Sequence, residues 1–260
     1  MTGFTLVNLE QQLLLWMLAM IRPGAAFLVA PIFGARSVPV QIRIILALAI
    51  GIPAASVSGL AVPESGVVSL DGLLMIVAEL LVGLSLGFAV QIGFAAAMVA
   101  GEAMSNSMGL GLASMADPAG GQPSTAIGQF LSMVATFLFL AMGGHLLLIG
   151  IILDSYTALP PGKAWLSADA ISGIVHFGGL IFALGLTIAL PVGFAMILVQ
   201  IIMGVVARST PTLNLFAVGI PAGLMVGVTL MAISMPILAD ALMAALNEGL
   251  SQSRVLGKGS

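Results

Sequence analysis

The chain has 260 residues, of which 60% are hydrophobic and 7% are charged, and its formal net charge is −3. Soluble domains carry about 25% charged residues, so this composition points to an integral membrane protein or to a subunit buried in an apolar assembly. The weak negative charge offers no basic surface for nucleic acid, and the lack of cysteine excludes disulfides and thiolate metal sites.

Apolar stretches follow one another along the chain, and each is long enough to form a helix. They cover residues 5–33, 38–62, 67–104, 125–155, 170–206 and 213–247. A helix needs about 20 residues to cross a bilayer, and no strand-like alternation is evident, so the pattern predicts an all-α membrane protein with about six long helices. No long linker interrupts the chain, and a single domain is predicted over residues 1–260.

The third, fourth and fifth stretches are too long for simple spans. Each holds more than 30 residues, or roughly 45–55 Å of helix, whereas the hydrocarbon core is only ~30 Å thick. Tilt absorbs some of the excess, and breaks at Gly143-Gly144, at Gly178-Gly179 or at Pro191 would absorb more. Bent helices or helical hairpins packed on protein therefore stand beside six simple spans as an alternative.

Glycine recurs at helical spacing in two places. Gly83 and Gly87 are four residues apart, as are Gly219, Gly223 and Gly227. Small residues on one helix face let two backbones approach closely. These positions predict tight packing between helices, within the chain or with partners.

Few residues are candidates for catalysis. Gly83-Leu-Ser-Leu-Gly87 matches the G-x-S-x-G elbow of hydrolases, but that motif requires a strand, a turn and a helix, whereas this one lies in an apolar helix. Ser85 is therefore interpreted as a packing hydroxyl, with an intramembrane hydrolase as the alternative. His145 and His176 lack metal-ligand spacing, and His145 is expected to cap or hydrogen-bond a helix neighbour. With no nucleotide or haem motif, we expect neither an enzyme nor a cofactor.

Five charged residues lie within apolar stretches or at their ends: Arg22, Glu79, Glu102, Asp154 and Arg208. Ionisable groups in such places are costly and face a partner, a cavity or water. A proton or ion relay would need several acids at helical spacing, whereas Glu79 and Glu102 are 23 residues apart. We expect structural ion pairs or charges at helix ends, with a relay as the alternative.

Residues 101–123, GEAMSNSMGLGLASMADPAGGQP, depart from this apolar pattern. Glycine and proline oppose a regular helix, and methionine is flexible and fills irregular gaps. An irregular segment between membrane helices has to face water, lie buried in protein or line a cavity. The composition fits both soft packing material beside a wet space and a mobile surface loop.

Four blocks of the sequence resemble the FliR family of flagellar export-gate subunits, called SctT in injectisomes. They are AGEAMSNSMGLGLASMADPAGG in the central segment, RPGAAFLVAPIFGARSVPVQIR at 22–43, FLFLAMGGHLLLIGIILDSYTALP at 137–160 and ALPVGFAMILVQIIMGVVARSTPTLNLFAVGIP at 189–221. The blocks occur in order and cover much of the chain. Each alone is weak, whereas the four together are specific.

The resemblance implies a non-enzymatic subunit of type III protein secretion, working in a hetero-oligomer in the bacterial inner membrane at the flagellar basal body. One such subunit joins several FliP-like and FliQ-like subunits in a helical gate, which an FlhB-like subunit wraps and which works with an FlhA-like component. Unfolded flagellar proteins pass through its centre, and the helices form bent hairpins above the bilayer plane. An injectisome gate subunit and a small-molecule or ion transporter are the alternatives.

The resemblance also implies that residues 105–122 form a plug that closes the channel at rest. A soft segment of this composition would fill an irregular pore without polar contacts to the substrate, and its glycines would let it move aside. The residues assigned to the plug and gate are Met104, Ser105, Met108, Gly109, Leu110, Gly111, Leu112, Met115, Asp117 and Pro118.

A second set of residues is expected to support structure and assembly. Residues 208–216 read as a tight turn between two long helices, with a proline that ends the first helix and an arginine that neutralises its C-terminus. The N-terminal members are expected to pin helix ends against partner subunits: Arg22, Pro23, Arg36, Pro39 and Arg43. The other members are Glu102, His145, Arg208, Pro211, Asn214 and Phe216.

Overall fold

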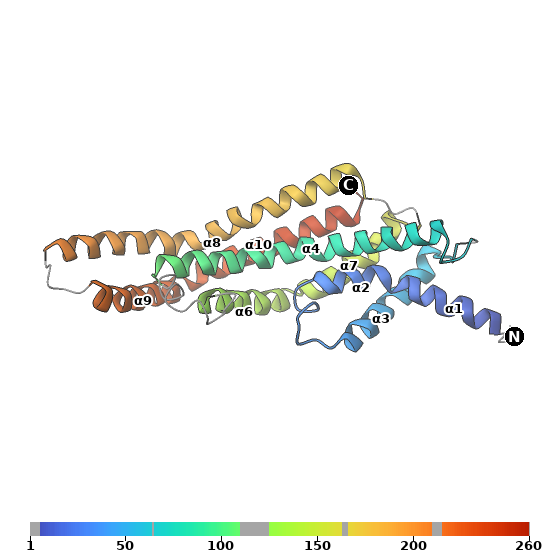
Figure 1. Cartoon of the computed structure of the whole chain (residues 1–260), viewed down its shortest axis with the longest axis horizontal. Helices are drawn as coiled ribbons and strands as arrows, with labels where there is room; N and C mark the ends of the chain where they lie inside the picture. The colour runs from blue at the N-terminus through green and yellow to red at the C-terminus, as the bar shows by residue number, and fades with distance from the viewer. Residues whose placement is uncertain (1–5, 64, 110–124, 163–165, 210–214, 260) are drawn as a thin grey trace. The chain divides into compact units, whose positions relative to one another are not determined.

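The structure, a computed structural model, describes residues 6–63, 65–109, 125–162, 166–209 and 215–259. Within these ranges it contains helices and no strand (Figure 1). The helices are α1 (Leu6–Ala19), α2 (Ile21–Val29), α3 (Val40–Ser58), α4 (Leu70–Ser107), α6 (Ala126–Ala141), α7 (Gly144–Ala158), α8 (Ala168–Ser209), α9 (Leu215–Ile233) and α10 (Met235–Gly257). The all-α prediction is confirmed.

Helix length and composition agree with a membrane location. Among the described residues, four helices are long and apolar enough to cross a membrane, or up to six if each of two bent helix pairs is one span. The bent pairs are α6 with α7, and the part of α9 from Pro221 onward with α10. The prediction of about six long, bent helices is therefore confirmed.

The chain divides into two compact units, each assembled from segments that are distant in sequence. Unit 1 comprises Met1–Ile92, Leu140–Gly178 and Glu248–Ser260, and unit 2 comprises Gly93–Phe139 and Gly179–Asn247. The long helices α4, α8 and α10 each contribute one end to unit 1 and the other end to unit 2. The single-domain organisation stays a prediction.

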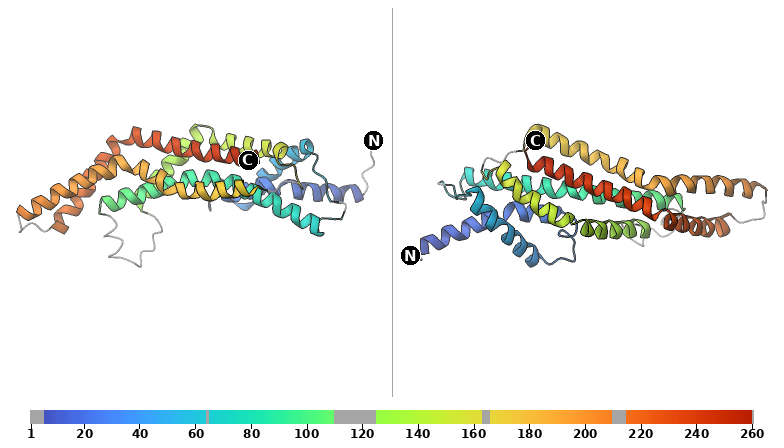
Figure 2. Two further views of the ribbon diagram at one scale, coloured as in Figure 1. Left: turned by 90° about the horizontal axis from the view of Figure 1, so that it is seen from above. Right: turned by 180° about the vertical axis from the view of Figure 1, so that it is seen from behind.

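The three N-terminal helices pack together in unit 1. α3 contacts both α1 and α2, and α7 in turn contacts α2 and α3. Both views in Figure 2 show α1, α2 and α3, the blue helices, gathered in one place. This arrangement brings the N-terminal block of the sequence next to the block that contains α7.

The break predicted at Gly143-Gly144 is present. α6 ends at Ala141 and α7 begins at Gly144, and Gly143 between them has a φ of 70°, a left-handed conformation that glycine adopts without strain. No break occurs at the other two places, Gly178-Gly179 and Pro191, because α8 continues through both. An interior proline removes one backbone donor, a loss that helices in apolar surroundings tolerate.

Two glycines set the packing of α4 on α2 in unit 1. A Cβ added at Gly83 would collide with the backbone oxygen of Arg22, and one added at Gly87 would collide with the backbone oxygen of Ala26. The contacts recur every four residues on both helices, so the glycine face of α4 lies along α2 with the backbones touching. The tight packing predicted from the Gly83–Gly87 spacing is confirmed.

Candidate functional site

The residues that flank segment 110–124 are bonded to each other within unit 2. Glu102 near the end of α4 accepts a hydrogen bond through Oε1 from the backbone N–H of Thr125, at 2.7 Å. The Thr125 hydroxyl in turn accepts a bond from the Gly128 N–H at 3.1 Å, which makes Thr125 the N-cap of α6. The Glu102 carboxylate therefore lies at the positive end of the α6 dipole, where a negative charge is stabilising.

A backbone contact reinforces this junction. A Cβ added at Gly101 in α4 would collide with the Cα atom of Gly128 in α6. The two helices therefore cross with their backbones in contact, one residue before Glu102. Together with the Glu102–Thr125 hydrogen bond, this crossing holds the end of α4 and the beginning of α6 side by side, and we call these contacts the segment base.

Three of the four described gate residues are buried in unit 2, and the fourth, Gly109, is half-buried. Met104, Ser105 and Met108 are at most 2% exposed. The Met108 side chain occupies the space that a Cβ at Gly227 of α9 would need, and its backbone oxygen lies near Gly223. Two of the glycines predicted to pack tightly thus pack on a gate methionine.

The helix continues further than the composition predicted. The helical stretch predicted over residues 67–104 extends to Ser107 in α4, although residues 105–107 lie in the part expected to be irregular. Buried methionines favour the helix, and Gln200 Nε2 donates to the Ser107 carbonyl oxygen at 2.5 Å, which satisfies one of the exposed carbonyls at the helix end. Gly109 follows with a φ of 84°. The remaining gate residues lie outside the described residues: Leu110, Gly111, Leu112, Met115, Asp117 and Pro118.

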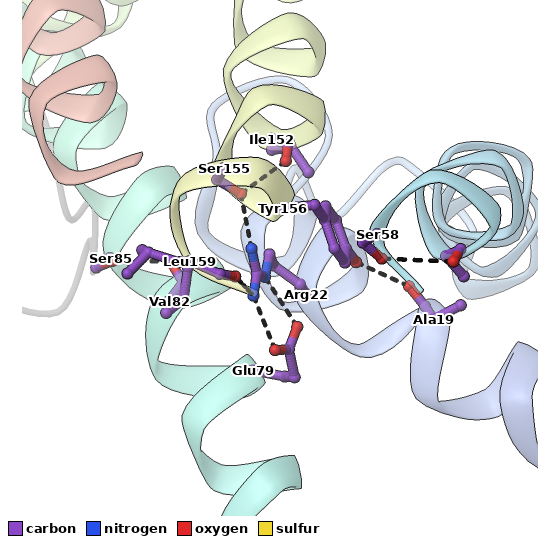
Figure 3. Close-up of polar contacts among 11 residues, drawn as sticks. Ala19, Arg22, Ser58, Glu79, Val82, Ser85, Ile152, Ser155, Tyr156 and Leu159 are labelled. Atoms are coloured by element: carbon purple, nitrogen blue, oxygen red, sulfur yellow. Dashed lines mark hydrogen bonds and ion pairs between the residues drawn. The ribbon is translucent and has the colours of Figure 1, made fainter. Parts of the chain in front are cut away.

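A buried polar cluster around Arg22 joins helices of unit 1 (Figure 3). The Arg22 side chain is fully buried, and its Nε and Nη2 atoms donate to the two carboxylate oxygens of Glu79, each at 2.8 Å. Nη1 donates to Ser155 Oγ at 3.0 Å, and Nη2 also donates to the Leu159 carbonyl oxygen at 2.8 Å. Parallel charge-assisted bonds of this kind are the strong form of the arginine–carboxylate pair.

Tyr156 completes the Arg22 cluster. The Arg22 guanidinium carbon lies 4.1 Å from the centroid of the Tyr156 ring, within range of a cation–π interaction. The Tyr156 hydroxyl donates to the carbonyl oxygen of Ala19 at 3.1 Å, at the end of α1. The cluster therefore ties α1, α2, α4 and α7 together, and its two charges neutralise each other. This geometry supports a structural ion pair rather than a proton relay.

The contacts of one N-terminal arginine, Arg22, differ from those expected. Arg22 is fully buried and bonds only this chain's residues, so its expected contact with a partner subunit is wrong, because a buried guanidinium requires a carboxylate and Glu79 provides it. Pro23 is likewise buried, near the start of α2. Arg43 Nη2 donates to the Ala35 carbonyl oxygen at 2.6 Å. The last two members of this group, Arg36 and Pro39, are exposed, and their partner contacts stay predictions.

Only some of the residues expected to support structure and assembly in the C-terminal half lie within the described part of the chain. Arg208 lies in the last turn of α8, as expected for a charge that neutralises a helix C-terminus. Pro211 and Asn214 lie outside the described residues, as does the side chain of Phe216. The bond expected of His145 is not found: its Nδ1 is buried and has no hydrogen-bond partner in the described part of the chain.

Neither the serine motif nor a metal site gains support from the structure. Ser85 lies inside α4 and its hydroxyl donates to the Val82 carbonyl oxygen at 2.7 Å, so the motif forms no strand–turn–helix elbow. No group of three His, Asp or Glu side chains that could hold a metal ion occurs among the described residues.

Sequence reasoning missed the residues that complete both sites. Ser155 and Tyr156 were not singled out, although both are polar residues in the apolar block at 137–160, which is a usable signal. Thr125 also went unnoticed. A threonine directly before an apolar helix is a typical N-cap and could have been found.

The sequence model of the family described as bacterial export proteins, family 1, matches residues 13–249. The chain belongs to this FliR family of bacterial export proteins. It is 36% identical over 220 residues to flagellar biosynthetic protein FliR of Escherichia coli (strain K12), covering 85% of this chain and 84% of the relative. The FliR protein of Pectobacterium carotovorum subsp. carotovorum is 32% identical over 84% of this chain and 83% of its own. That of Bacillus subtilis (strain 168) is 30% identical over 86% of each.

The FliR-family match covers both sites. The Arg22 cluster and the segment base lie within residues 13–249. The four sequence blocks thus led to the family that the comparison identifies, and that prediction is confirmed.

Proposed function

We propose that the chain is a subunit of the flagellar type III protein export gate. Together with several FliP-like and FliQ-like subunits, and next to FlhB-like and FlhA-like components, it forms a helical channel in the bacterial inner membrane through which unfolded flagellar proteins are exported. The observation that carries this proposal is the similarity, over more than 80% of both chains, to relatives named flagellar biosynthetic protein FliR.

The apolar surface of α8 supports work inside an assembly. Only 28% of the most apolar 18-residue stretch of α8 is buried within the chain. Bulky side chains of this helix such as Phe182 and Phe194 are more than 60% exposed. A Cβ at Gly193 or Gly204 would meet no atom within 4 Å, so the helix leaves room for another backbone to approach. Exposed apolar patches of this kind require lipid or partner subunits to cover them.

The segment base supports a gating role for residues 105–122. Met104, Ser105 and Met108 are buried in unit 2, so in this proposal they anchor the segment, and the part that moves aside is residues 110–122. Because the base holds both flanks together, the segment can move without any change in the helices on either side. Its glycines permit the movement, and its Met and Leu side chains fill the pore at rest.

The proposed function is tested by the subunit composition of the native complex. The affinity-tagged full chain, extracted from its own host in mild detergent, is expected to co-purify with several copies of two other small membrane proteins. Recovery of a monomer or homodimer that conducts small solutes would contradict the gate and support the transporter. Loss of flagellar protein secretion on deletion of the gene separates a flagellar gate from an injectisome gate, whose deletion would stop effector secretion instead.

A further inference from the structure

Three of the chain's few charged residues line one hollow in unit 1. The hollow has a volume of about 390 Å³, and Asp154 of α7, Arg254 of α10 and Lys258 just after α10 are part of its wall. The whole chain has only seven Lys and Arg and ten Asp and Glu residues. Three charges in one hollow of so apolar a chain call for a physical explanation.

Packing contacts fix the two helices that carry these charges. Gly257 at the end of α10 lies against Ile151 of α7, where an added Cβ would be 3.3 Å from Ile151 Cγ2. The buried Ser253 hydroxyl donates to the Leu86 carbonyl oxygen at 3.0 Å, which attaches α10 to α4. Arg254 in the last turn of α10 and Lys258 just after it both line the hollow. The walls of the hollow are therefore held in place by packing between helices of unit 1.

The three charges are not paired with one another. Asp154, Arg254 and Lys258 are exposed, and the ion pair found within the described residues is that of Arg22 with Glu79. Arg254 and Lys258 are favourable at the C-terminal end of α10, but Asp154 lies near the C-terminal end of α7, where a negative charge is unfavourable. Interaction with a helix dipole thus accounts for the positions of Arg254 and Lys258, but it does not account for the position of Asp154.

We propose that this hollow binds the headgroup of a phospholipid that carries a primary ammonium group. The headgroup phosphate accepts hydrogen bonds from Arg254 and Lys258, and the ammonium group donates to the Asp154 carboxylate. The glycerol headgroup of phosphatidylglycerol would offer Asp154 only neutral hydroxyl groups in place of an ammonium group, and the quaternary ammonium group of phosphatidylcholine has no N–H to donate. The volume falls within the roughly 300–1,000 Å³ usual for small-ligand sites.

Lipid is the expected occupant because unit 1 contains helices suited to a bilayer. The ranges Leu9–Val29 and Val40–Ser58 are both long and apolar enough, by length and composition, to cross a membrane, and this proposal takes unit 1 to be in contact with lipid. The inference is independent of the proposed function, since it needs only a membrane location.

The test is native mass spectrometry of the delipidated full chain, titrated separately with phosphatidylethanolamine, phosphatidylglycerol and phosphatidylcholine. The unaltered chain is expected to retain phosphatidylethanolamine best. Asp154→Asn is expected to weaken that binding by about tenfold, to the level of phosphatidylglycerol, because one charge-assisted bond is lost. Arg254→Gln with Lys258→Gln is expected to weaken the binding of phosphatidylethanolamine and phosphatidylglycerol alike.

Matched controls use exposed charges elsewhere on the helices. Glu248→Gln on α10 and Arg208→Gln on α8 are expected to leave lipid binding unchanged. Soluble glycerophosphoethanolamine is expected to compete for the site, because recognition rests on the headgroup. Equal retention of the three lipids by the unaltered chain, or an unchanged preference in Asp154→Asn, would overturn the proposal. Displacement of the lipid by a neighbouring subunit in the assembled complex would also overturn it.

Discussion

Replacing Glu79 with alanine is expected to destabilise the chain by about 3–5 kcal/mol, because the Arg22 guanidinium would stay buried without its carboxylate. Arg22 is fully buried, and its other hydrogen-bond acceptors, Ser155 Oγ and the Leu159 carbonyl oxygen, are neutral. The melting temperature of the detergent-purified chain, followed by circular dichroism, is expected to fall by roughly 10 °C.

Two further variants make this test specific to the ion pair. Removing both charges, in Arg22→Leu with Glu79→Leu, is expected to recover much of the lost stability, since no uncompensated charge remains in the core. Glu248→Ala, which removes an exposed carboxylate, is expected to change stability by less than about 0.5 kcal/mol. A melting temperature that is the same in Glu79→Ala as in the unaltered chain would show that the cluster does not hold unit 1 together.

Replacing residues 110–122 with a short Gly/Ser loop is expected to raise the resting leak of the assembled gate severalfold. The change removes the Leu and Met side chains proposed to fill the pore, whereas the segment base, with Glu102 bonded to Thr125, is kept. The measurement is the conductance of the purified complex in planar bilayers, together with small-solute leakage in cells.

The composition of the segment, rather than its order, is expected to matter for sealing. A scrambled sequence of residues 110–122 is therefore expected to keep the leak low, because methionine and leucine fill irregular spaces in many arrangements. The triple substitution of Leu110, Leu112 and Met115 by serine is expected to leak like the loop replacement. If the loop replacement leaves conductance unchanged, the segment does not close the pore.

The sequence predicted local features of the fold better than the contacts between distant residues. The break at Gly143 and the close packing at Gly83 and Gly87 follow from glycine's missing side chain, a property that is read at the position itself. Among the local features, a break along α8 was not found, since Pro191 lies inside a continuous helix. One proline removes one donor, and the apolar pattern on both sides outweighs that loss.

In the two sites as well, the sequence indicated which residues were unusual but not which distant residues they contact. Arg22 and Glu79 were recognisable as charges in apolar stretches, but not as partners, because they are 57 residues apart and meet only through the packing of α4 on α2. His145 was expected to bond a helix neighbour, yet local sequence could not show that its Nδ1 lies buried without an acceptor or donor nearby. The end of α4 extends to Ser107 through contacts from Met108 and Gln200, which sequence spacing does not reveal.

Photo-crosslinking from within the segment tests the central claim most directly. A crosslinking amino acid is placed at Leu112, and separately at the exposed Phe182 of α8 as a control, in cells that hold an export substrate stalled in the gate. A gate whose central passage is closed by this segment predicts substrate adducts from position 112 and none from position 182. Adducts from position 112 that contain only lipid or outer subunits, with none to the substrate, would contradict the account.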